Sequence, residues 1–125
     1  MKKEIPVILE DGEEKSFPFV ANGATAIFYR STFNEDLLIA MNALNDLDTA
    51  KTNTLVILKL AYIMNYQAEH DGAAFDANMD DFISWAAKLD GMSVYDRSGE
   101  IVGLYRGQRD TESKPKNQAA PQTAK

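Results

Sequence analysis

The 125-residue sequence predicts a mainly helical α+β protein: an N-terminal β-hairpin, about five helices and a disordered C-terminal tail. Three observations predict this fold class. Two short segments near the N-terminus alternate apolar and polar residues, as half-buried strands do. Later segments repeat apolar residues at helical spacing, and after Gly107 the apolar residues are alanines and prolines only. We therefore expect one globular domain over residues 1–106 and a polar tail over 107–125.

The segments 4–9 and 15–20 are expected to form the two strands of the hairpin. The apolar residues that alternate on one face are Ile5, Val7 and Leu9 in the first strand and Phe17 and Phe19 in the second. Burying both sets on the same face favours an antiparallel pair with one face on the core.

The strand register follows from this shared face. We expect Val7 opposite Phe17, which also places Pro6 opposite Pro18. Because proline donates no ladder hydrogen bond, this pair should be of the non-hydrogen-bonded type. The register closes a loop of five residues after Leu9, since a two-residue turn would put the phenylalanines on the wrong face.

Two asparagines are expected to start the first two helices. Asn22 is expected to cap a helix over about 23–32. Asn34 is expected to cap the next, with Glu35 and Asp36 in its first turn, where the helix dipole favours negative charge. The residues at helical spacing are Ala24, Ile27, Phe28 and Ser31 in the first helix and Leu37, Leu38, Met41 and Leu44 in the second.

A third helix over about 52–69 is apolar nearly all round, which predicts the central buried helix. The pair Asp71-Gly72 ends it, after a polar connection over 45–53. A fourth helix is expected after a cap at Asp76. Its expected inner face consists of Met79, Phe82, Ile83, Ala86 and Leu89, beside Trp85.

The last helix is predicted from Val94 to about Arg106. Ser93 with Asp96 forms a short capping box in front of it. Ile101, Leu104 and Tyr105 are its core candidates. Two glycines inside this segment, at positions 99 and 103, lower its helix propensity.

Charge and composition restrict the class of partner. The net charge is −6 and the pI is about 4.7. The tail from Gly107 carries +2, which leaves −8 for the residues before it. An acidic body repels phosphate backbones, so we expect no nucleic-acid partner. No apolar run reaches the roughly 18 residues of a membrane span, and no secretory signal is recognisable, so no membrane association and a cytoplasmic protein are expected.

No set of polar residues predicts a reaction centre. Cysteine is absent, and the lone His70 lies at a helix end, where a surface role near the dipole suffices. The carboxylates Asp71, Asp76, Asp80 and Asp81 lack the spacing of an EF-hand loop. The serines lack a G-x-S-x-G context, and the glycines are isolated. We expect no catalytic, cofactor or metal site, and therefore no enzyme.

A cluster around the corner between the first two helices is the candidate for partner contact. Its members are Tyr29, Arg30, Phe33, Leu37 and Met41. An apolar groove here would suit an amphipathic partner helix. The alternative is structural: Arg30 and Asp36 flank the corner and would form a local ion pair.

Several segments, in order, resemble the tail assembly chaperones of long-tailed bacteriophages and prophages of Gram-positive bacteria. These segments are FPFVANGATAIFYRSTFNEDLL, LKLAYIMNYQA and FDANMDDFISWAAKLDGMSVYD, followed by a last helix and a polar tail with lysines. The central element is the F-x-A-x-G-A-T pattern from Phe19, followed by YR, F and DLL. One departure is the last helix, which is often longer and more apolar in the family and is interrupted here at 97–99.

The resemblance implies a non-enzymatic chaperone in the cytoplasm of the host bacterium that is absent from the mature virion. Such proteins bind the tape-measure protein and assist tail-tube assembly. Many are also made in a longer form by programmed ribosomal frameshifting, and the extension recruits the major tail tube protein. The alternative is a structural tail component, such as a connector or completion protein.

Overall fold

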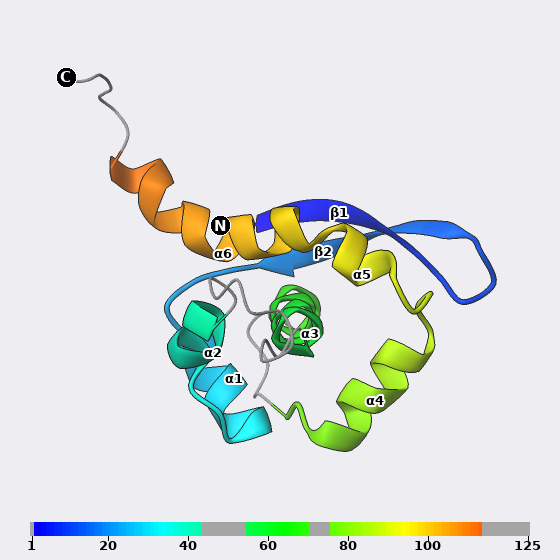
Figure 1. Cartoon of the computed structure of the whole chain (residues 1–125), viewed down its shortest axis with the longest axis horizontal. Coiled ribbons are helices and arrows are strands. Elements are labelled where there is room, and N and C mark those ends of the chain that lie inside the picture. The colour runs from blue at the N-terminus through cyan, green and yellow to red at the C-terminus, as the bar shows by residue number, and fades with distance from the viewer. Residues whose placement is uncertain (1, 44–54, 71–75, 114–125) are drawn as a thin grey trace.

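The computed structural model has an N-terminal hairpin followed by helices, which confirms the mainly helical α+β class (Figure 1). The structure describes residues 2–43, 55–70 and 76–113. The elements in chain order are β1 (Lys2–Ile8), β2 (Glu14–Val20), α1 (Thr25–Phe33), α2 (Leu37–Ala43), α3 (Leu55–Glu69), α4 (Met79–Ala87), α5 (Ser93–Asp96) and α6 (Ser98–Ser113). The predictions for Leu44, for the connection 45–53 and for the break at Asp71-Gly72 lie outside the described residues.

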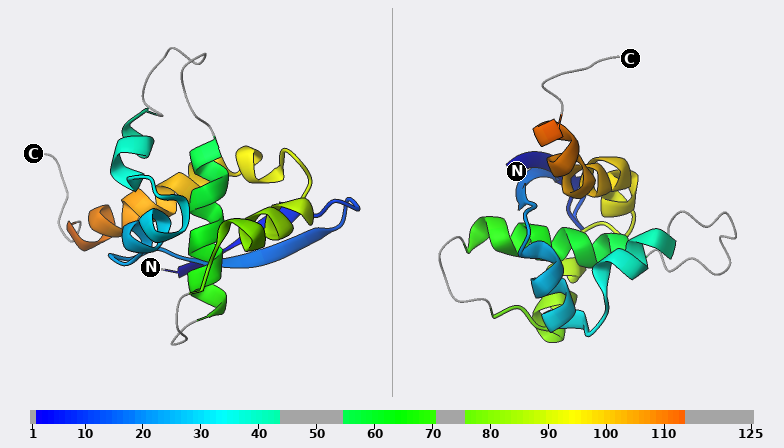
Figure 2. Two further views of the ribbon diagram at one scale, coloured as in Figure 1. Left: turned by 90° about the horizontal axis from the view of Figure 1, so that it is seen from below. Right: turned by 90° about the vertical axis from the view of Figure 1, so that its left-hand side faces the viewer.

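Helix α3 lies at the centre of the molecule, as its all-round apolar sequence predicts. It contacts β2 and each of the other helices, and Figures 1 and 2 show these elements arranged around it. Its buried residues are Val56, Lys59, Leu60, Ala61, Tyr62, Ile63, Met64 and Asn65. The core is therefore built around one helix, against which the hairpin packs on one side and the other helices pack on the others.

The hairpin has the expected buried face but a different register. Phe17 pairs with Ile5, whereas Val7 was its expected partner. The prolines are not opposed either, because Pro6 pairs with Ser16. A shift of two residues leaves every side chain on its original face, because the strand period is two. The predicted inner residues therefore still point to the core: Ile5, Val7 and Phe19 are buried, and Phe17 and Leu9 are partly buried against them.

The turn explains the shift in register. Five residues, 9–13, connect the strands, so the predicted length is correct and its position is one residue earlier. Leu9 N–H donates to Glu13 O at 2.8 Å, and Gly12 N–H donates to Leu9 O at 2.9 Å. Gly12 has φ +90°, which gives the arrangement of a G1 bulge after a tight turn. Leu9 also bridges to Leu89, so the end of β1 is held from both sides.

The first two helices begin later than predicted. Asn34 has φ 54°, and its N–H donates to Arg30 O, so it ends α1 and does not cap α2. Asp36 takes that role, since its Oδ1 accepts the N–H of Ile39 at 3.0 Å. Asn22 caps the turn before α1: its Oδ1 accepts the N–H of Ala24 at 2.9 Å. Helix α1 itself starts at Thr25, two residues after the expected start.

The fourth and fifth predicted helices also differ at their starts. Asn78, and not Asp76, caps α4, because its Oδ1 accepts the N–H of Asp81 at 2.9 Å. The predicted capping box at Ser93 is wrong: this residue lies inside the short α5, is buried, and its hydroxyl donates to Asp90 O at 3.3 Å. Arg97 separates α5 from α6, so the predicted single helix is two.

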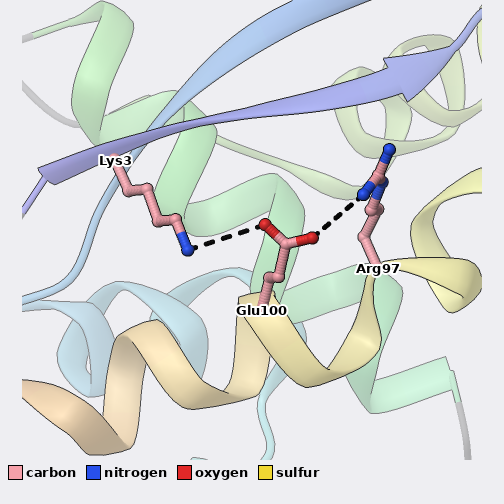
Figure 3. A network of polar contacts seen from close by, with 3 residues as sticks. All are labelled: Lys3, Arg97 and Glu100. Atoms are coloured by element: carbon pink, nitrogen blue, oxygen red, sulfur yellow. Dashed lines mark hydrogen bonds and ion pairs between the residues drawn. The ribbon is translucent and has the colours of Figure 1, made fainter.

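Helix α6 lies against β1 and α3. Glu100 joins it to the hairpin, with its carboxylate 3.6 Å from Lys3 Nζ and 3.0 Å from an Arg97 guanidinium nitrogen (Figure 3). These partly exposed pairs contribute little stability, about 0–1 kcal/mol each. The helix continues to Ser113, so the first part of the segment predicted as a disordered tail, residues 107–113, is helical.

Candidate partner-binding surface

The five predicted contact residues lie mostly inside the molecule. Tyr29, Leu37 and Met41 are buried in the core, so they do not present a surface to a partner. Phe33 is half-buried against the same core, and Arg30 is exposed. The sequence places these residues at one corner, as the structure does, but it does not reveal which side of each helix faces inward.

Glu35 is the carboxylate that holds this corner, and the sequence reasoning missed it. The Tyr29 hydroxyl donates to Glu35 Oε1 at 2.7 Å, and Lys59 Nζ lies 3.4 Å from the same oxygen. Lys59 is only 8% exposed and also lies over the Phe33 ring, 5.2 Å from its centroid. Burial, with the Glu35 hydrogen bond and charge, raises the pKa of the Tyr29 phenol well above its usual range.

The alternative reading of the corner is also corrected. Both Arg30 and Asp36 are described, and no ion pair joins them. Asp36 instead caps α2 through the N–H of Ile39. The polar contacts of Glu35 thus fix the corner, one with Tyr29 across the turn and one with Lys59 on α3.

Aromatic rings connect α1, α3 and α4 below this corner. The Phe33 ring lies 5.0 Å from Phe82 and 6.3 Å from Tyr62, centroid to centroid, in edge-to-face geometry. The Tyr62 hydroxyl donates to Asp81 Oδ2 at 2.5 Å. Burial and this bond to Asp81 raise the pKa of Tyr62 well above its usual range. Phe33 is therefore a packing residue at the junction of three helices.

The motif that carries the family resemblance also has structural roles. Phe19, Ala21 and Thr25 are fully buried. The Thr25 hydroxyl donates to Gln67 Oε1 at 2.7 Å, and Gln67 Nε2 donates to Asn22 Oδ1 at 3.1 Å. These bonds tie the start of α1 to α3. The F-x-A-x-G-A-T pattern therefore specifies how α1 leaves the sheet.

Helix α2 presents two large apolar side chains to solvent. Leu38 is 59% and Ile39 is 70% exposed, and we call this pair the α2 face. Leu38 was expected in one apolar stripe with Leu37 and Met41, but it points outward while those two are buried. The inner side of the helix is taken by Leu37 and Met41, one turn apart, so their neighbours in sequence point outward. Ile27 on α1, which helical spacing grouped with Phe28, is 67% exposed.

Helix α4 likewise exposes residues that were expected inside. Met79 is 45% and Ile83 is 57% exposed. They are one turn apart on the helix, and we call this pair the α4 face. The inner side of α4 carries Phe82, with Trp85 packed beside it on the core.

A small pocket of about 170 Å³ lies between α3 and α4, and its lining includes Ser84, His70 and Asp81. These residues do not form a nucleophile–base–carboxylate arrangement. His70 Nδ1 lies 3.0 Å from Tyr66 O, as expected for a histidine at a helix end, and Asp81 accepts the Tyr62 hydroxyl. Within the described residues, no hydrogen bond joins Ser84 to His70 and no three acidic or histidine side chains are placed to hold a metal ion.

No known protein family matches this sequence, and no curated protein or solved structure is significantly similar to it. None of the helices in the described ranges combines the length and apolar character needed to cross a bilayer. The exposure of the apolar pairs on α2 and α4 makes these two faces the candidate partner-binding surface.

Proposed function

We propose that this protein is a non-enzymatic tail assembly chaperone of a long-tailed phage or prophage. It binds the tape-measure protein in the host cytoplasm, assists tail-tube assembly and is absent from the mature virion. The observation that carries the proposal is the α2 face, Leu38 and Ile39, presented to solvent by an acidic chain. A chaperone of a long helical protein needs such a surface, since amphipathic helices bind through their apolar side.

The α2 face is held in place from behind. Leu37 and Met41 anchor the helix in the core, and Asp36 caps its first turn. Binding then costs little ordering of α2 itself. Burying one leucine or isoleucine completely contributes about 1.5–3 kcal/mol, so two half-exposed side chains support a weak, reversible contact. Reversible contacts suit a chaperone that is displaced when tube subunits polymerise.

The proposal extends to a longer, frameshifted form that recruits the major tail tube protein. Helix α6 runs along the hairpin, and its last turns project beyond the rest of the molecule (Figures 1 and 2). One chain could then hold the tape-measure protein and present a tube subunit at the same time, which raises the effective concentration of the second partner.

Co-purification with the tape-measure protein of the same phage or prophage tests the proposal. The double variant Leu38→Ser/Ile39→Ser removes the α2 face without touching the core. We expect it to capture about tenfold less tape-measure protein than the original chain, because its apolar contact area is lost. The matched control is Met92→Ser, which removes an exposed apolar side chain (60% exposed) outside the α2 face. This variant should bind the tape-measure protein as the original chain does.

The composition of purified virions separates the proposal from the structural alternative. A chaperone is absent from finished particles, whereas a connector or completion protein is present in a fixed number of copies. Quantitative mass spectrometry of gradient-purified virions makes the distinction. A stoichiometric amount of this chain in the particles would identify a tail component and refute the chaperone proposal.

A further inference from the structure

We infer that the α4 face, Met79 and Ile83, is a second docking site, whose occupant is an amphipathic protein helix with lysine or arginine beside its apolar stripe. This inference goes beyond the proposed function, because nothing in it depends on the α2 face or on the tape-measure protein. It combines three features of α4: fixed orientation, exposed apolar side chains and an acidic border.

The orientation of α4 is fixed by contacts on its inner side. Phe82 is buried against Phe33 and Tyr62, with ring centroids 5.0 and 5.4 Å apart. Trp85 Nε1 donates to the buried Asn65 Oδ1 at 2.9 Å. The helix therefore does not rotate to bury Met79 and Ile83 without breaking these contacts, and the α4 face is a lasting part of the surface.

Carboxylates border the α4 face. Asp80 lies three residues before Ile83 on α4, so the two fall on the same flank of the helix. Asp76 lies two residues ahead of the Asn78 cap, outside the helix, at the end where Met79 begins it. Both aspartates are exposed, and within the described residues neither carboxylate forms a hydrogen bond or an ion pair. No lysine or arginine occurs from position 76 to 87. The first such residue is Lys88, at the C-terminal end of α4, so the border is negative at the N-terminal end of the face.

This charge selects among the possible occupants. A second copy of the chain also carries a net charge of −6, so bringing two acidic chains together is electrostatically unfavourable. Nucleic acids and anionic membranes are disfavoured for the same reason. A helix with an apolar stripe edged by lysine or arginine would bury the apolar pair and form ion pairs with the carboxylates.

The α2 and α4 faces are separate sites. The two helices lie on different sides of α3 in the views of Figures 1 and 2. Variants of one face therefore leave the other intact. The two proposals can then fail independently, because the proposed function is tested on Leu38 and Ile39 and this inference on Met79 and Ile83.

The test uses a labelled synthetic helix of leucine and lysine, about 18 residues long, with a matched peptide in which glutamate replaces each lysine. Fluorescence anisotropy with the full chain measures the dissociation constant. We expect the lysine peptide to bind and the glutamate peptide to bind at least about tenfold more weakly. Equal binding of the two peptides would overturn the charge argument.

Four variants locate the site. Met79→Ser/Ile83→Ser and Asp76→Asn/Asp80→Asn should each weaken the lysine peptide by about fivefold or more. Leu38→Ser/Ile39→Ser should retain tight binding, and so should the control Met92→Ser. Circular dichroism and thermal melting confirm that each variant is folded. Unchanged binding by the folded α4 variants, or loss of binding only in the α2 variant, would overturn the inference.

Discussion

Single buried polar residues hold the elements of this protein together. Asn65 is the clearest example, because its amide nitrogen donates to Pro18 O at 2.9 Å and its oxygen accepts from Trp85 at 2.9 Å. One side chain on α3 thereby fixes both the hairpin and α4. The sequence alone shows an asparagine within an apolar helix, but it does not show which distant groups that asparagine pairs.

Replacing Asn65 should therefore be costly. Asn65→Ala leaves the Pro18 carbonyl and the Trp85 indole N–H without partners in the interior. We expect a loss of about 2–4 kcal/mol in the free energy of unfolding, measured by urea denaturation. Asn42→Ala, at an exposed position on α2, is the control and should change stability by less than about 0.5 kcal/mol. A similar loss in both variants would contradict this role of Asn65.

Because two tyrosines are buried, we expect the free energy of unfolding to fall in alkali. The pKa values of Tyr29 and Tyr62 are raised far above the ordinary 10.0 by burial and by their carboxylate partners. Above pH 10 the unfolded chain loses these protons while the folded chain keeps them. Each tyrosine should then lower the free energy of unfolding by about 1.4 kcal/mol per pH unit. Their contribution is complete below pH 10 and decreases above it.

Comparison with Tyr29→Phe isolates one of these contributions. Urea denaturation at about pH 9 and pH 11 gives the fall in stability for each protein, and the fall should be smaller for Tyr29→Phe because one phenol is removed. An equal fall in both proteins would show that Tyr29 ionises at its ordinary pKa in the folded state.

At the scale of elements, the sequence predicts which segments form helices better than it predicts their inner faces. The segment 37–43 has apolar residues at most positions, so several helix rotations bury equivalent surface. Only the packing of Leu37 and Met41 against the core decides that Leu38 and Ile39 point outward. The caps are ambiguous for a similar reason: Asn34 and Asp36 both suit the start of a helix, and the left-handed backbone of Asn34 assigns it to the end of α1.

Replacing either of two glycines with alanine should change stability, in opposite directions for the helix and for the hairpin turn. Gly103 lies on the exposed side of α6, and nothing is within 4 Å of the position a Cβ would occupy. Gly103→Ala should therefore stabilise the protein by about 0.5–1 kcal/mol through higher helix propensity. Thermal denaturation measures the change, and destabilisation by this variant would contradict the helical assignment at Gly103.

Gly12 provides the matched case in the hairpin turn. There is also open space around it, but its φ is +90°, which disfavours any other residue. Gly12→Ala should lower stability by about 1 kcal/mol from backbone strain alone. The same thermal measurement applies, and a neutral effect would mean that the turn reaches another conformation without cost.

At the scale of the whole molecule, the central position of α3 and the buried face of the hairpin were predictable from the pattern of apolar residues. The register was not, because shifts of two residues keep the same faces, and the bulge at Gly12 decides between them. The partner surface was not predictable either. Apolar residues in short helices are assigned to the core by pattern, and only the assembled fold shows that some of them remain outside.

The most direct test of a chaperone with an apolar binding face is the solubility of its partner. The tape-measure protein is co-expressed with this chain, with Leu38→Ser/Ile39→Ser or with Met92→Ser, and its soluble fraction is measured after centrifugation. We predict that the original chain and Met92→Ser keep it in solution and that the α2 variant leaves it in the pellet. A folded α2 variant that keeps the tape-measure protein soluble would contradict the proposed role of the α2 face.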